Sequence, residues 1–546
     1  MKPFDTNGNF KPLSEEKGKL RKLAVQGAGT SLFASGAGLA IQIISTMVLA
    51  RILVPQDFGV VAMATTFSLL LANIGLNGIT EAVVQRESLS HAVASNLFWI
   101  NIGVGLLLTA GFAASGSLLA RFYHDARVAA IAVGVSVTIV VTSLSVVHLA
   151  LLKRAMRFPS VSVNDICARC ISALIAIVLG FAGWGYWALV AGVVALPLST
   201  AIGAWYLCRW VPCLPRRAEG TGEMVVFAVH TYGFFGINYC ARNLDNFLIG
   251  WRFNAQALGF YKKAYDLFAL SSGQISSSLT LVVLSTLSRL SRDIAQYRRY
   301  FLRALAVLAF VGMAIAADLT LVGTDLIRLL LGPGWEASGR IFTFFAPGIG
   351  LMLIYVTYGW IHLSIGRPDR RLRWGIVEFI VTAMLFLVAL PWGPDGIAIA
   401  WTVSFLVLLV PAFWYAGKPI GFGVVPVLST IWRYAAAALL AGCASSVVVR
   451  KIPFLLAMGG AKGALIRVLS VSVLFVFLYL GAVIILFSGI TPLTQFAGLI
   501  RDMLPRQVRE TARNGRKLRS CEFEYRRPTS DRLFYHWTRQ DTLKVV

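Results

Sequence analysis

A mid-segment arginine stands out among the residues that could do chemistry in this sequence. Arg242 lies near the middle of an apolar segment, three residues before Asp245, and three amides flank the pair: Asn238, Asn243 and Asn246. A guanidinium near the centre of a bilayer costs about 2.5–3.5 kcal/mol, so it needs a compensating role. Its planar fork of N–H donors matches a phosphate or a carboxylate. We expect Arg242 to hold a phosphate or pyrophosphate, with Asp245 orienting it. A structural ion pair between these two residues is the alternative.

Polar side chains recur at helical spacing in four apolar segments, one of which carries Arg242. They are Ser31, Ser35, Gln42, Ser45 and Thr46; Thr66, Asn73, Asn77 and Thr80; Asn238, Arg242 and Asp245; and Ser271, Gln274, Ser278 and Ser285. Such stripes indicate helices that face protein or water, because amides and hydroxyls rarely face lipid in a row. We interpret them as the lining of a water-filled cavity. Helix–helix hydrogen bonding is the alternative.

Other titratable side chains in the apolar segments have simpler interpretations. Asp165 and Arg169 are spaced for an ion pair across one helical turn, and Glu378 occupies nearly the equivalent place in a later segment. Asp318 lies toward the end of its segment, where a side chain can reach water. A solitary histidine such as His148 is more typical of packing than of a proton relay.

No motif for covalent catalysis is present in the sequence. It contains no Walker-type phosphate loop, no HExxH and no GxSxG. Cys167 and Cys170 form a CxxC, but without a second pair the motif favours helix packing over a metal or redox site. We expect no disulfide, no metal and no cofactor, and we predict that the protein is not an enzyme.

The elements that must position these residues are membrane-spanning helices. Of the 546 residues, 57% are hydrophobic and 14% are charged, which excludes a soluble enzyme, a disordered scaffold and a secreted disulfide module. Since one crossing takes about 20 apolar residues, hydropathy predicts an all-α polytopic protein of about fourteen helices. Its predicted spans are 28–50, 58–80, 94–120, 128–152, 162–182, 186–208, 225–250, 265–287, 303–323, 341–364, 374–391, 396–416, 430–449 and 465–488.

The basic residues indicate how these spans are oriented. In a soluble chain the net charge of +25 would suggest nucleic acid, but here 24 Lys and Arg fall in one alternate set of connections and 12 in the other. Positive charge prefers the cytoplasmic side of a membrane. We therefore predict two cytoplasmic termini and no nucleic-acid partner.

A short motif recurs after two hundred positions and divides the spans into two lobes. The stretch at 49–59 contains Gln56 and Gly59, and the stretch at 249–259 repeats them as Gln256 and Gly259. Six predicted spans separate the copies, so both cross in the same direction and the lobes are related by an axis along the membrane normal. Two like-oriented lobes of this kind suit a transporter that rocks between two states.

The sequence thus predicts five parts along the chain. They are a cytoplasmic segment at 1–27, an N-terminal lobe of six spans at 28–208, a C-terminal lobe of six spans at 225–416, two further helices at 430–488 and a basic tail at 501–546. The first segment is too polar for a cleavable signal peptide. We expect the tail to be cytoplasmic and largely disordered; an anchor for anionic lipid headgroups or a docking segment for partners is the alternative.

Several stretches together resemble one family. Residues 50–86 read ARILVPQDFGVVAMATTFSLLLANIGLNGITEAVVQR, residues 241–250 read ARNLDNFLIG, residues 329–335 read LLLGPGW, and residues 364–369 read SIGRPD. As a set they resemble the polysaccharide-export flippases, the Wzx or PST type of the MOP superfamily, over residues 30–490. The chain departs from that pattern at Ser285, where a proline is usual, and at Asp318, where an apolar residue is expected.

The resemblance implies a transporter of the bacterial inner membrane. Such a protein flips a polyprenyl-pyrophosphate-linked oligosaccharide from the cytoplasmic to the periplasmic leaflet by alternating access, for exopolysaccharide, capsule or O-antigen assembly. Arg242 would hold the pyrophosphate, and the polar stripes would contact sugar through side chains such as Gln42, Asn73, Asn77 and Gln274. The polyprenyl chain would stay in lipid. The implied partners are this lipid-linked substrate, membrane lipid, and a polysaccharide polymerase with its export machinery.

Two other functions compete with this interpretation. A multidrug cation antiporter of the same superfamily should place a carboxylate in the cavity of the N-terminal lobe. A polytopic glycan polymerase, ligase or acyltransferase should show a long periplasmic segment, or a cluster of histidines and acids at the membrane surface. The longest predicted external connection, about 324–340, offers only four charged side chains: Asp325, Arg328, Glu336 and Arg340.

Overall fold

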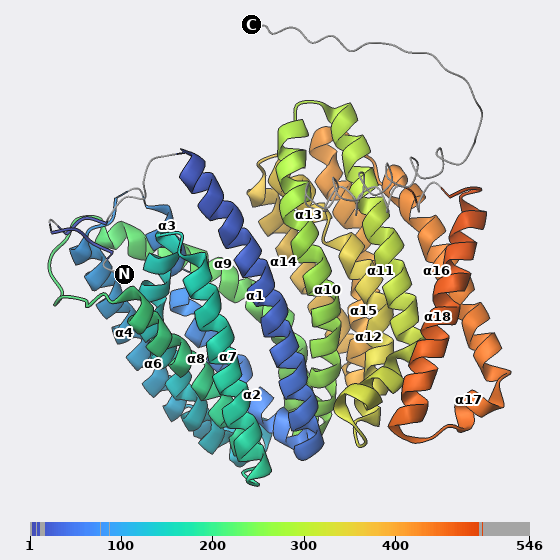
Figure 1. Ribbon diagram of the computed structural model, residues 1–546, viewed down its shortest axis with the longest axis horizontal. Coiled ribbons are helices and arrows are strands. Elements are labelled where there is room, and N and C mark those ends of the chain that lie inside the picture. The colour runs from blue at the N-terminus through green and yellow to red at the C-terminus, as the bar shows by residue number, and fades with distance from the viewer. Residues whose placement is uncertain are drawn as a thin grey trace, which may run out of the picture. The chain divides into compact units, whose positions relative to one another are not determined.

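The computed structural model describes residues 3–6, 8–10, 17–76, 78–86, 88–490 and 494, and these residues are almost entirely helical (Figure 1). The α-helices are α1 (Lys17–Ile52), α2 (Pro55–Leu76), α3 (Ile79–Gln85), α4 (His91–Ala114), α5 (Gly116–Tyr123), α6 (Arg127–Arg154), α7 (Phe158–Phe181), α8 (Tyr186–Cys208), α9 (Thr221–Arg252), α10 (Ala255–Leu290), α11 (Ile294–Leu331), α12 (Glu336–Tyr355), α13 (Tyr358–Ser364), α14 (Pro368–Ala389), α15 (Gly393–Gly417), α16 (Val425–Arg450), α17 (Pro453–Ala457) and α18 (Gly460–Leu486). The predicted all-α class is confirmed. The predicted tail at 501–546 lies outside the described residues.

The helices have the length and apolarity of membrane spans. Among the described residues, eleven helices or continuous helical runs could cross a bilayer, or twelve if the bent α9 is included. One of these runs, at 368–420, contains both α14 and α15. The protein is therefore a multi-pass membrane protein, while the total of fourteen crossings stays a prediction.

The first half of the chain, α1 to α8, packs largely around α6. This helix contacts α2, α4 and α8, and α1 packs on α7. Local sequence sets the helix starts: Ser90 Oγ accepts the Val93 N–H at 3.3 Å before α4, and Pro159 occupies the first turn of α7, where its missing N–H costs nothing. The predicted ion pair between Arg169 and Asp165 forms, with 2.9 Å between its atoms.

The second half of the chain, α9 to α15, packs around α12. This helix contacts α10, α11 and α15, and α14 lies against α15. The helical run formed by α12 and α13 supplies part of the core. The run is broken by a short turn, since α12 ends at Tyr355 and α13 begins at Tyr358. The turn brings two tyrosines to one place. It becomes important for the site described below.

Polar contacts tie α18 to α11 within the apolar bundle. Arg467 on α18 binds both carboxylate oxygens of Asp325, at 2.6 and 2.9 Å, and Ser472 donates to Asp318 at 3.0 Å. Asp318, interpreted from sequence as reaching toward water, instead accepts this hydrogen bond from a neighbouring helix. The departure from the family pattern at this position therefore fastens α18 to the second half.

Breaking the pair between Arg467 and Asp325 should destabilise the protein. Arg467→Met leaves a carboxylate that is largely shielded from water without its partner, and we expect a loss of about 1–3 kcal/mol of stability. Thermal unfolding of the purified protein in detergent would measure this loss. The exchanged pair Arg467→Asp with Asp325→Arg should recover much of it, and an unchanged melting temperature in Arg467→Met would contradict the assigned role.

The two copies of the repeated motif contact each other directly. The helix α1 ends at Ile52 and α9 at Arg252, while α2 begins at Pro55 and α10 at Ala255, so the boundaries repeat at the interval seen in the sequence. At this contact, called the seam below, the first turns of α2 and α10 touch through Gly59 and Gly259. A Cβ on Gly59 would lie 1.6 Å from the Ala255 carbonyl oxygen, and one on Gly259 would lie 1.9 Å from the Pro55 carbonyl oxygen.

Aromatic side chains extend the seam in a reciprocal manner. Trp335, from the second half, donates its indole N–H to the Ala50 carbonyl at 2.9 Å. In the first half, Tyr123 lies so close to Gly250 that a Cβ there would be 2.7 Å from its ring. Since positions 50 and 250 are equivalent in the repeat, each half covers the end of the other half's first helix. The two halves are closed together at this end of the bundle.

Candidate functional site

Arg242 is carried by a bent helix that contacts both halves of the chain. The segments 221–237 and 239–252 of α9 are inclined by 41° to each other. On one side of α9, the hydroxyls of Tyr232 and Tyr239 donate to the Leu70 and Thr66 carbonyls of α2, at 2.8 and 2.9 Å. Arg242 follows the bend and lines a pocket with residues of the second half.

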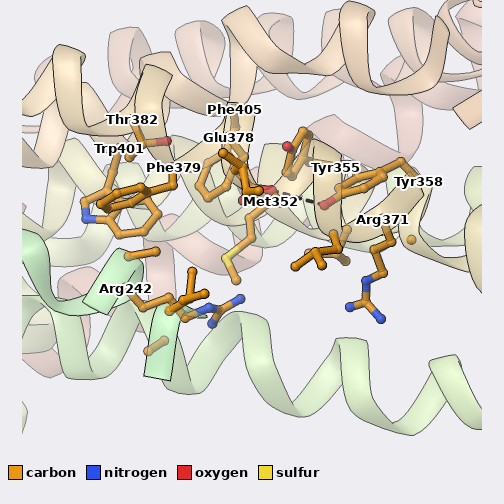
Figure 2. Close-up of a pocket in the computed structure, with 18 of the residues that line it drawn as sticks. Arg242, Met352, Tyr355, Tyr358, Arg371, Glu378, Phe379, Thr382, Trp401 and Phe405 are labelled. Carbon is orange, nitrogen blue, oxygen red and sulfur yellow. Dashed lines mark hydrogen bonds between the residues drawn. The ribbon is translucent and has the colours of Figure 1, made fainter. Parts of the chain in front are cut away.

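The pocket has a volume of about 200 Å³ and is lined by residues of α9, α10 and α12 to α15 (Figure 2). Aromatic rings form much of its wall: Tyr265, Phe268, Tyr355, Tyr358, Phe379, Trp401 and Phe405. Three lining residues carry a formal charge, namely Arg242 on α9 and Arg371 and Glu378 on α14. The pocket therefore combines two cations and one anion with rings that offer broad apolar faces.

Tyrosine hydroxyls hold the glutamate of the pocket. Tyr358 donates to the Glu378 carboxylate at 3.1 Å (Figure 2). Trp374 donates to the Tyr355 hydroxyl at 2.9 Å. Both tyrosines flank the turn between α12 and α13. In the part of the chain that the structure describes, neither Arg242 nor Arg371 lies within ion-pair distance of a carboxylate. Both guanidinium groups can therefore bind an anion.

Asp245 was expected from the sequence to orient Arg242. In the structure it contacts residues at the wall of the pocket instead. Its carboxylate is fully buried and accepts hydrogen bonds from the Tyr261 hydroxyl at 2.7 Å and the Trp401 indole N–H at 2.9 Å. The described contacts of Asp245 include no ion pair with Arg242. Asp245 thus positions Trp401, which in turn lines the pocket.

The predicted asparagines whose side chains the structure describes form hydrogen bonds within their own helices. Asn243 donates to the Tyr239 carbonyl and Asn246 to the Asn243 side chain, which are bonds along α9 itself. Asn73 donates to the Leu69 carbonyl within α2. Asn77 and the side chains of Asn238 and Gln274 lie outside the described residues. A cavity shared by α1, α2, α9 and α10 stays a prediction.

Gln42 lies at a second, smaller pocket beside the seam. This pocket is lined by residues of α1, α10 and α11, including Thr46, Lys263 and Asp266. Lys262 and Lys263 both pair with Asp266, and the Lys263 ammonium stands 4.3 Å from the ring centroid of Phe58 on α2. The contact between Lys263 and Phe58 joins the halves near the closed end of the bundle.

Sequence reasoning missed several residues that line the larger pocket. Arg371 lies in the predicted connection between the spans at 341–364 and 374–391, and Tyr355, Tyr358 and Trp401 belong to none of the polar stripes. Arg371 and Glu378 are seven residues apart, which places them on one helix face. That spacing was the one available signal.

A bundle of membrane-spanning helices with a charged pocket inside one half has the architecture of a membrane transporter. Residues 48–339, more than half of the chain, match the polysaccharide biosynthesis protein family, and the protein belongs to this family. The family expected from the sequence, that of polysaccharide biosynthesis and export, is confirmed.

Two curated relatives and one solved structure support this assignment. The chain is 23% identical to the teichuronic acid biosynthesis protein TuaB of Bacillus subtilis over 345 residues, which cover 63% of this chain and 70% of TuaB. It is 21% identical to the succinoglycan biosynthesis transport protein ExoT of Rhizobium meliloti over 364 residues, 66% of this chain and 73% of ExoT. Its fold is similar to that of the lipid II flippase MurJ in an inward closed conformation, with a TM-score of 0.68 and 13% identity over 85% of this chain and 99% of MurJ.

Proposed function

We propose that this protein flips a polyprenyl-pyrophosphate-linked oligosaccharide from the cytoplasmic to the periplasmic leaflet of a bacterial inner membrane. The observation that carries the proposal is the Arg242 guanidinium, which lies in an aromatic pocket on an apolar helix and forms no ion pair with the carboxylates that the structure describes. A cation at this depth is costly unless it binds an anion, and a guanidinium suits phosphate oxygens. The names of the relatives TuaB and ExoT, which concern polysaccharide biosynthesis, favour a glycan as the remainder of the substrate.

Solvation explains why such a substrate needs a protein. The hydroxyls and pyrophosphate of the head group cannot cross hydrocarbon without losing hydrogen bonds to water, whereas the polyprenyl chain is stable in lipid. The arginines would hold the pyrophosphate, and aromatic faces such as that of Trp401 would pack against sugar rings. The predicted amides of the first half would complete the sugar contacts if the halves enclose the head group.

The closed seam supports alternating access between the two halves. With both termini in the cytoplasm, as the charge distribution predicts, the seam lies on the periplasmic side, and the structure is then closed to the periplasm. Opening the seam while the opposite ends approach would carry the head group across. A multidrug cation antiporter is less well supported, because two of the three charges in the larger pocket are positive.

Depletion of the protein from its host tests the proposal. Lipid-linked oligosaccharide should accumulate with its glycan facing the cytoplasm, so a lectin added to intact spheroplasts should not reach it, while lysed spheroplasts should bind the lectin. Restored expression should return the glycan to the outer surface. Glycan that remains exposed on intact spheroplasts during depletion would refute a flippase and favour a step after translocation.

A further inference from the structure

The larger pocket contains a second arginine and a glutamate to which the proposed function has given no role. Arg371 and Glu378 stand two turns apart on one face of α14, and Arg242 enters from α9. Figure 2 shows the side chains of all three turned into the same pocket. Two arginines from different helices can each bind one phosphate of a pyrophosphate, which gives more charge-assisted contacts than one arginine alone.

The glutamate places its carboxyl group beside the two cations without forming an ion pair with either of them. The Tyr358 hydroxyl binds its carboxylate at 3.1 Å, and neither guanidinium is within ion-pair distance. A bound pyrophosphate would experience the attraction of both arginines together with the repulsion of this carboxylate. A transporter benefits from that combination, because a site that binds too tightly cannot release its cargo.

Resting on the proposed function, we propose that Arg242 and Arg371 form a two-armed clamp for a lipid pyrophosphate and that Glu378 is the release residue of this clamp. Tyr358 keeps the carboxylate away from the arginines, so the clamp stays open to substrate. Glu378 then weakens the bound state by charge repulsion, which allows the head group to leave. The shared turn between α12 and α13 sets the position of Tyr358 and hence the balance between binding and release.

Binding of farnesyl pyrophosphate to the purified full-length protein in detergent tests the clamp. Glu378→Gln keeps an oxygen for the Tyr358 hydroxyl but removes the charge. Two unit charges about 10 Å apart interact by about 1.7 kcal/mol at an effective dielectric of about 20, which is on the order of tenfold in affinity, so this variant should bind about tenfold more tightly. Arg371→Gln should bind about tenfold more weakly or more. The matched control Arg373→Gln removes an exposed charge from the same helix outside the pocket and should bind as the parent does.

Tyr358→Phe provides an independent check of the release role. Without the hydroxyl, the carboxylate is free to pair with an arginine, so affinity should fall severalfold, opposite to the effect of Glu378→Gln. The double variant Tyr358→Phe with Glu378→Gln should behave like Glu378→Gln alone, because no carboxylate remains at position 378 to pair with an arginine. A purely structural glutamate would instead give weaker binding in Glu378→Gln, and that result, in protein that still elutes as a single species on gel filtration, would overturn the proposal.

The same measurements separate the clamp from the proposed function. Binding that follows this pattern in a protein that fails the spheroplast test would support a pyrophosphate site and remove the flippase. Normal translocation with no measurable binding of farnesyl pyrophosphate, or with equal binding of farnesyl monophosphate, would overturn the two-armed clamp and leave the flippase standing.

Discussion

Arg242→Ala should leave the protein in the membrane but block export of the glycan. Loss of a charge-assisted contact to phosphate corresponds to about 1.5–3 kcal/mol, which is a fall in affinity of about ten- to a hundredfold. The helix α9 itself should persist, because Tyr232 and Tyr239 anchor it to α2 and Asp245 retains its partners Tyr261 and Trp401. Surface polysaccharide and lipid-linked precursor in a complemented deletion strain would measure the effect.

A second arginine of α9 provides the control for this variant. Arg252 ends the helix and lies outside the pocket, so Arg252→Ala removes the same side chain from the same element without touching the site. It should export polysaccharide normally. Normal surface polysaccharide in Arg242→Ala, at equal protein levels, would remove this residue from the mechanism.

Gly59→Leu should prevent the seam from closing and should stop transport. The added Cβ would lie 1.6 Å from the Ala255 carbonyl oxygen, and this backbone atom cannot move aside as a flexible side chain could. Forcing extra carbons into a close contact costs about 1–3 kcal/mol, which lowers the closed population by about five- to 150-fold. Each half keeps its own packing, so the protein should still insert and fold.

Cysteine labelling would report on the seam in this variant. Ala50 is 4% exposed beneath Trp335, so a cysteine at this position, in a protein without its native cysteines, should resist a water-soluble maleimide and become reactive after Gly59→Leu. Gly103→Leu is the matched control, since a side chain at Gly103 meets open space. Active transport in Gly59→Leu, or unchanged protection at position 50, would refute a seam that must close.

Much of the fold could be predicted because bilayer physics acts on local sequence. Long apolar segments must form helices in lipid, where every backbone N–H and C=O needs an internal partner. Residues such as Ser90, Asn254 and Pro159 then begin individual helices through their own caps or fixed φ angles. The repeat at Gln56 and Gln256 likewise predicted the equivalence of α2 and α10, whose starts lie two hundred residues apart.

The site was less predictable, because partners in it come from distant parts of the chain. Arg242 could be singled out because a guanidinium in an apolar segment raises the free energy of inserting that segment into a bilayer. This penalty can be calculated from the sequence alone. Asp245 was assigned to it by proximity along the helix, but the carboxylate binds Tyr261 and Trp401, which are 16 and 156 residues away. Proximity in sequence could not show which of several donors a buried carboxylate would reach.

The sequence by itself determined a helical membrane protein with a repeated motif and a guanidinium inside an apolar segment, because hydrophobic transfer and backbone hydrogen bonding depend on residue type and order. Only the tertiary structure decided that Arg371 and Glu378 share a pocket with Arg242, and that Gly59 and Gly259 close one end of the bundle. Those relations depend on how α14 and α9 pack and on how α2 meets α10. Helix packing is set by the fit of many side chains at once, and no single segment encodes it.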